Sequence, residues 1–175
     1  LFRRGEMSLH SRVGVQEGLL YGDYFFVSAL QLVAQKKYSS GIMESMIRAV
    51  KSMTHAQIME SENQIDSLEK YWEYAHGKTG ALMRMCATLP LEYYGLTHAT
   101  LEEFALKYGL AFQVADDLSD FSQNKDEPSL PAFIGYESSQ NVLENLRREL
   151  DALHIIPSAE LPFIPFEPIA LKEKK

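Results

Sequence analysis

The sequence reads Phe112-Gln113-Val114-Ala115-Asp116-Asp117-Leu118-Ser119-Asp120 in its second half, and this stretch decides how the whole chain is interpreted. On a helix, Asp116 and Asp120 share one face, and Asp117 lies one step around the cylinder. Carboxylates this close repel one another, so the cluster favours a bound cation. Oxygen-only ligands indicate a hard divalent metal, most often Mg²⁺, which keeps waters and accepts further ligands from a phosphorylated substrate.

Composition narrows the class of protein. The 175 residues suffice for one domain with a sizeable core, and 46% of them are hydrophobic. A formal net charge of -7 argues against nucleic acid or an anionic membrane surface as a partner. Cys86 is the single cysteine, so no intrachain disulfide can form, which favours a cytoplasmic location. No apolar run approaches the roughly 20 residues that span a membrane.

Apolar residues recur at helical spacing throughout, and no segment alternates as a strand does, so we predict an all-α fold. We expect Asp66 with Glu69, and Thr100 with Glu103, to cap the third and fourth helices, and Pro90 to end the third. The predicted helices are residues 15–35, 42–62, 66–88, 100–121 and 137–153.

The C-terminal residues differ in composition from the rest. Four prolines fall between positions 157 and 168 and forbid a regular helix. We therefore predict a helical domain over residues 1–153 and an extended tail over residues 154–175. Phe163, Ile164 and Phe166 are expected to pack the tail on the body.

Three further segments carry side chains suited to phosphate. Lys78 offers a point charge and Thr79 a hydroxyl, although a surface Lys-Thr pair beside a helix kink is the simpler interpretation of this segment taken alone. Arg3 and Arg4 suit bidentate phosphate binding, but they also fit a frayed basic terminus. His10 reads most simply as a partly buried structural histidine. Gln113, three residues before Asp116, can reach the same ligand as the aspartates.

In this order and spacing the motifs resemble the trans-isoprenyl diphosphate synthase family, also called polyprenyl synthetases. The resemblance covers about residues 3–153. It rests on Arg3-Arg4-Gly5 with His10, Gly22-Asp23-Tyr24, Lys78-Thr79-Gly80-Ala81-Leu82, and Gly109-Leu110-Ala111-Phe112-Gln113 running into the aspartates. The last of these is similar to the family's second aspartate-rich motif.

The resemblance implies an isoprenoid-synthase-type helical bundle around a central cavity, usually a homodimer. Such enzymes condense isopentenyl diphosphate with an allylic diphosphate. By resemblance, Arg3 contacts the allylic diphosphate and Arg4 isopentenyl diphosphate, with His10 also in the substrate site. Lys78, Thr79 and Gln113 bind the allylic diphosphate and steady the developing cation. Asp116, Asp117 and Asp120 hold Mg²⁺.

The sequence also departs from the family pattern. The first aspartate-rich motif of the family ends four residues before the paired arginines, whereas only Leu1 and Phe2 precede Arg3 here. Met7 stands where a proline is usual. Lys125 is the single lysine between Asp120 and Pro131, and we assign it a diphosphate contact.

Three interpretations remain open at this stage. The chain is the C-terminal portion of a prenyltransferase, a partner-dependent or non-catalytic subunit of a heteromeric synthase, or a class I terpene cyclase. The third fits least, because those enzymes lack the arginine pair and the Lys-Thr-Gly segment.

Overall fold

The computed structural model describes residues 2–3, 6–36, 38, 40–121, 128–156 and 160–161. The chain divides into two compact units, residues 1–43 and 44–175. Both are built mainly of helices, which confirms the predicted all-α class. Across the described residues, each helix is too short or too polar to cross a membrane.

The first unit contains three short elements that the sequence analysis did not predict. The strands β1 (Phe2–Arg3) and β2 (Glu6–Met7) pair antiparallel, and the short helix α1 (Leu9–Val13) follows. Two-residue strands are too short to show alternation, so the periodicity could not have indicated them. Arg12 fastens α1 to the hairpin, donating to the Met7 carbonyl at 3.0 Å and to Glu6 Oε2 at 3.1 Å.

The long helix of this unit, α2 (Val15–Gln35), has the predicted bounds. Gly14 separates it from α1 with a φ of 99°, a left-handed conformation that glycine adopts without steric cost. The next helix, α3 (Ser40–Ser61), begins at the end of the first unit and lies mostly in the second.

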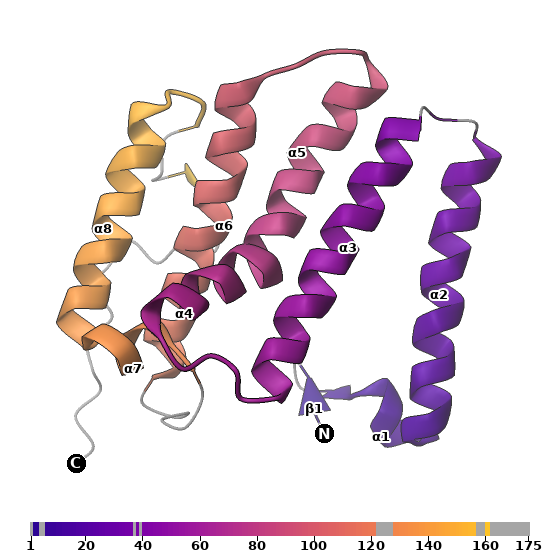
Figure 1. The fold of residues 1–175 in the computed structure, drawn as a ribbon, viewed down its shortest axis with the longest axis horizontal. Helices are drawn as coiled ribbons and strands as arrows, with labels where there is room; N and C mark the ends of the chain where they lie inside the picture. The colour runs from indigo at the N-terminus through magenta and orange to yellow at the C-terminus, as the bar shows by residue number, and fades with distance from the viewer. Residues whose placement is uncertain are drawn as a thin grey trace. The chain divides into compact units, whose positions relative to one another are not determined.

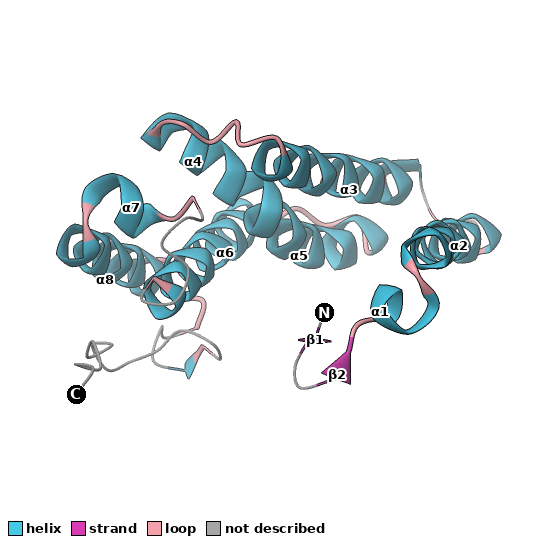
Figure 2. Ribbon diagram, turned by 90° about the horizontal axis from the view of Figure 1, so that it is seen from below, coloured by secondary structure: helices cyan, strands magenta, loops and turns pink. Residues whose placement is uncertain are grey.

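The second unit is a bundle centred on α6 (Ala99–Asp120). Figure 1 shows α6 between α5 (Ala81–Tyr93) and α8 (Tyr136–Ala152). Figure 2 shows these three helices in a row, with α3 and α4 (Leu68–Ala75) along one side of it. A π-helical turn, η1 (His76–Gly80), connects α4 to α5 without a break, and the short α7 (Leu130–Ile134) precedes α8.

The core of this unit forms where α6 meets α4, α7 and α8. Residues from all four helices are at most 2% exposed, and the largest are Tyr71, Tyr74, Val114, Leu130 and Leu150. Burying a side chain of this size contributes roughly 1.5–3 kcal/mol. The core therefore fixes α6, and with it the aspartate motif, against the rest of the unit. Leu161 joins this core, while Phe163, Ile164 and Phe166 lie outside the described residues.

Three of the predicted helix ends were wrong. Pro90 lies inside α5, which continues to Tyr93. A proline costs a helix one hydrogen bond, and near a C-terminus little helix remains to be disrupted. Ser67, not Asp66, caps α4 by accepting from the Lys70 amide. His98 caps α6 by accepting from the Leu101 amide, so Thr100 is already helical.

Candidate active site

Two glycines bring the Lys-Thr segment against the aspartate helix. Gly109 of α6 crosses Gly80 of η1 so closely that a Cβ at position 109 would lie 2.9 Å from the Gly80 Cα. One turn further along α6 lies Gln113, whose Oε1 accepts a 2.6 Å hydrogen bond from the Thr79 hydroxyl. The predicted pair, Thr79 and Gln113, is therefore in direct contact.

Asp117 points into the protein, away from the face of the other two aspartates. It is 8% exposed and accepts three hydrogen bonds of 2.8 Å. The Tyr71 hydroxyl and the Leu130 amide donate to Oδ2, and Gln113 Nε2 donates to Oδ1. Burial raises the pKa of Asp117, although these three donors oppose the rise.

Asp116 and Asp120 remain exposed on the face where we predicted a metal. Burial of its surroundings and the negative charge of Asp120 raise the pKa of Asp116, and the charge of Lys78 only partly offsets them. A raised carboxyl pKa means that negative charge is under-compensated here. A cation between the two side chains would supply that compensation.

The three aspartates do not converge on one point. Among the described residues there is no group of three or more His, Cys, Asp and Glu side chains that could hold a metal ion. The donors that fit Mg²⁺ are the Asp116 and Asp120 carboxylates, and water or a substrate phosphate would complete its shell. The assignment of Asp117 as a metal ligand stays a prediction.

Lys78 is engaged by a carboxylate that the sequence analysis missed. Its Nζ lies 2.8 Å from Glu60 Oε1 and 2.5 Å from the Tyr74 hydroxyl, which itself donates to Glu60. Burial acts to raise the pKa of Glu60, but hydrogen bonds from Lys78 and Tyr74 outweigh it and leave the pKa below its ordinary value. Glu60 lies in the last turn of α3 and belongs to none of the motifs, so no local pattern could have indicated it.

These side chains surround one small cavity of about 70 Å³. It is lined by Glu60, Tyr74, Lys78, Gln113, Asp116, Asp117, Asp120, Phe121, Pro128 and Ser129. One cationic side chain, a carboxamide and a pair of exposed carboxylates thus face the same space. That combination suits a diphosphate held together with a divalent cation.

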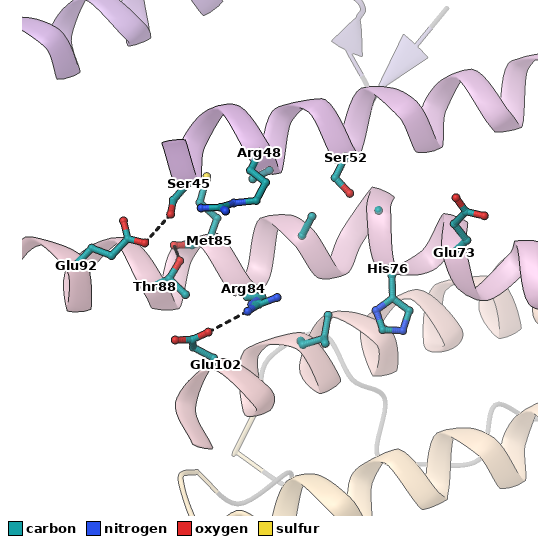
Figure 3. A pocket seen from close by; sticks show the side chains of 14 residues that line it. Ser45, Arg48, Ser52, Glu73, His76, Arg84, Met85, Thr88, Glu92 and Glu102 are labelled. Carbon is teal, nitrogen blue, oxygen red and sulfur yellow. Dashed lines mark hydrogen bonds and ion pairs between the residues drawn. The ribbon is translucent and has the colours of Figure 1, made fainter. Parts of the chain in front are cut away.

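A larger groove of about 600 Å³ lies on another face, between α3, α5 and α6 (Figure 3). Some of its polar groups are engaged with one another. Ser45 donates to Glu92 at 2.6 Å, and Arg84 pairs with Glu102 at 3.1 Å. None of the predicted site residues lines it. The groove is the larger of the two, but the small cavity holds the charged and amide side chains that suit a diphosphate with a metal ion, so we take the small cavity as the candidate site.

The remaining predicted site residues lie in the first unit or outside the described residues. Arg3 and His10 belong to the first unit, where His10 is exposed and its Nε2 lies 3.3 Å from the Ser8 hydroxyl. His10 is thus not the partly buried histidine that its simplest interpretation suggested. Arg4 and Lys125 lie outside the described residues.

The Glu60–Lys78 pair predicts a pH-dependent contribution to stability. A carboxyl pKa lowered by folding stabilises the protein above the pKa of the unfolded chain, and this stabilisation is lost as pH falls through the folded value. We expect Glu60→Gln to lower stability by up to about 1 kcal/mol at pH 7 and by less at pH 3. Thermal melts at both pH values measure this, with Glu44→Gln, an exposed change on the same helix, as control. An equal loss at both pH values would contradict it.

Comparison with known proteins decides the family. A family model described as polyprenyl synthetase matches residues 1–129. The chain belongs to the polyprenyl synthetase family. Its curated relatives include the nonaprenyl diphosphate synthase of Mycobacterium tuberculosis, 31% identical over 130 residues, which cover 71% of this chain and 38% of that protein.

Solved structures of the isoprenoid synthase fold superpose on this polyprenyl synthetase. An isoprenoid synthase family member from Thermotoga neapolitana aligns with a TM-score of 0.77 and 27% identity over 87% of this chain and 60% of its own. A Helicobacter pylori geranyltransferase complexed with magnesium and isoprenyl diphosphate aligns with a TM-score of 0.71 over 89% and 60%, and at 24% identity shows the fold alone. The chain thus spans between 38% and 60% of the length of these relatives.

Proposed function

We propose that this polyprenyl synthetase acts in a magnesium-dependent prenyltransferase that joins isopentenyl diphosphate to an allylic diphosphate. The observation that carries the proposal is the cavity where Lys78, Gln113 and the exposed carboxylates of Asp116 and Asp120 meet. The name of the curated relative supports it, because that protein is a nonaprenyl diphosphate synthase.

The proposed reaction explains why these side chains gather. The allylic C–O bond breaks, pyrophosphate leaves with both bonding electrons, and the double bond of isopentenyl diphosphate attacks the allylic carbon before a proton is lost. Lys78 would neutralise the leaving pyrophosphate, and Gln113 with Thr79 would present oxygen atoms toward the allylic cation. Mg²⁺ held by Asp116 and Asp120 would offset further charge on the leaving group.

Glu60 has a part in this scheme that follows from its contacts. In the structure it accepts from the ammonium group that the substrate would need. A diphosphate carries more negative charge than one carboxylate, so it would compete successfully for Lys78. Until then, Glu60 and Tyr74 hold the lysine over the cavity instead of letting it extend into water.

The other predictions from the resemblance remain proposals. They are diphosphate contacts by Arg3, Arg4, His10 and Lys125, a homodimer, and a cytoplasmic location. A partner-dependent subunit is the second candidate, favoured by one observation: the described residues supply two free carboxylates where a larger acidic group would be needed to hold several metal ions.

One assay separates these functions. We would incubate the full-length gene product with isopentenyl diphosphate, geranyl diphosphate and Mg²⁺ and identify the products by mass spectrometry. A longer prenyl diphosphate with released pyrophosphate supports the proposal. Product formed only after a second synthase subunit is added supports the partner-dependent subunit, and hydrocarbons without a longer diphosphate would indicate a cyclase.

Lys78 provides the sharpest test of substrate binding. We expect Lys78→Ala to raise the KM for the allylic diphosphate by about 10- to 100-fold, because a charge-assisted hydrogen bond to phosphate is lost. Lys70→Ala is the matched control, since Lys70 pairs with Asp66 in solvent. Steady-state kinetics measure both variants. A KM for Lys78→Ala equal to that of the control would show that Lys78 does not bind the allylic diphosphate.

A further inference from the structure

A chain of hydrogen bonds connects Tyr71 to Thr79 through Asp117 and Gln113. Which partner donates in each bond is fixed from the Asp117 end. The Leu130 amide can only donate, and it donates to Asp117 Oδ2. The Tyr71 hydroxyl donates to the same oxygen. Both bonds hold the carboxylate in one orientation, with Oδ1 turned toward Gln113.

The carboxylate then dictates how the Gln113 amide is turned. An ionised carboxylate only accepts, so the amide must present its N–H to Asp117 and its oxygen to Thr79. The Thr79 hydroxyl in turn uses its single proton on that oxygen, at 2.6 Å. Among the described residues no group donates to the Thr79 oxygen, so both of its lone pairs are available to a ligand.

We propose that Asp117, held by Tyr71, is a positioning residue that sets the direction of this hydrogen-bond chain, so that Thr79 presents lone pairs rather than a proton to the reacting substrate. The inference deepens the proposed function and rests on it. A lone pair directed at a developing allylic cation stabilises it, whereas a free O–H proton would repel it. Reversing the chain would leave Thr79 with a free proton.

The contacts of Asp117 also set it apart from its neighbour in the motif. Both of its oxygens already accept from the protein, and the side chain is 8% exposed. Asp116 is exposed, and none of the described residues donates a hydrogen bond to its carboxylate. Donors from three different elements occupy most of the acceptor sites of the Asp117 carboxylate, and its burial restricts the approach of a hydrated metal ion. We therefore assign the metal to Asp116 and Asp120 alone.

Binding of magnesium and inorganic pyrophosphate tests this division without turnover. Calorimetric titration of the full-length protein should show Asp117→Asn within about threefold of wild type. Asp116→Asn should bind at least about tenfold more weakly, because changing even a residue that only supports a metal ligand typically costs about 10- to 100-fold. Equal weakening in both variants would make Asp117 a ligand and overturn the inference. No magnesium-dependent uptake by wild type would instead overturn the proposed function.

Kinetics then test the direction of the chain. In Asp117→Asn the amide oxygen can still accept from Tyr71 and Leu130, while its NH₂ faces Gln113 and forces that amide to turn around. Every hydrogen bond can be kept, but Thr79 must now accept from the Gln113 NH₂ group, which leaves the Thr79 hydroxyl proton free. We expect kcat to fall by about 10- to 100-fold at saturating Mg²⁺ with little change in the KM for the allylic diphosphate.

A second substitution should restore the original direction. Adding Gln113→Glu to Asp117→Asn supplies an acceptor-only side chain, which accepts one hydrogen bond from the asparagine amide and another from the Thr79 hydroxyl. We expect the double variant to recover kcat at least fivefold over Asp117→Asn. Failure to recover, or an unchanged kcat in Asp117→Asn, would overturn the inference. Tyr71→Phe is the second test if Asp117→Asn folds poorly, because it keeps the buried ring and removes only the hydrogen bond to Asp117. We expect kcat to fall in Tyr71→Phe as well, and an unchanged kcat in that variant would overturn the inference.

Discussion

We expect the replacement of Asp116 with alanine to lower turnover of the proposed prenyltransferase by about 100-fold or more, because the leaving pyrophosphate would lose the metal-assisted neutralisation of its charge. Thermal stability should change little or even rise. The side chain is exposed, and its raised pKa shows that folding already disfavours its charge, through the burial of its surroundings and through Asp120. Loss of function without loss of stability is thus the expected signature.

Single-turnover kinetics and thermal melts of the same preparation measure the two effects. Asp151→Ala, an exposed change at the end of α8, provides the control. The magnesium concentration for half-maximal activity should rise in Asp116→Ala and stay unchanged in the control. Turnover within a factor of two of wild type would remove Asp116 from the metal site.

The helical fold was predictable because apolar residues recur at helical spacing along the whole length of its long helices. The bounds of α2 and α8 follow from that pattern to within a residue or so. The errors fall where one side chain decides a local contact. His98 caps α6 through its ring nitrogen, a role that residue types alone assign to serine or threonine. Two-residue strands and five-residue helices are too short to show a period.

The candidate site was predictable in part for a similar reason. Thr79 and Gln113 belong to local motifs, and the structure brings them into contact. Glu60 has no motif, and only the tertiary packing places it on Lys78. The sequence puts Asp116 and Asp117 side by side as equals, yet neighbouring helix positions differ by about 100°. This rotation buries one carboxylate and exposes the other.

The crossing of Gly109 over Gly80 supports the whole arrangement, and Gly109→Ala should therefore destabilise the protein by about 1–3 kcal/mol. A methyl group at position 109 would meet backbone atoms, namely the Gly80 Cα at 2.9 Å and its nitrogen at 3.3 Å. Backbone cannot rotate aside as a side chain can, so α6 and η1 must separate. For a chain of this length each kcal/mol corresponds to a fall of about 2–4 °C in Tm.

The same separation should weaken the Thr79–Gln113 hydrogen bond one turn away, so activity should fall together with stability. Gly22→Ala is the matched control, because it replaces a helical glycine whose Cβ would meet nothing within 4 Å. That change should leave stability equal or raise it by about 0.5–1 kcal/mol through helix propensity. Thermal melts and product assays of both variants decide the matter. If Gly109→Ala were as stable and active as wild type, the close crossing would not be what brings Lys78 and Thr79 to the aspartate helix.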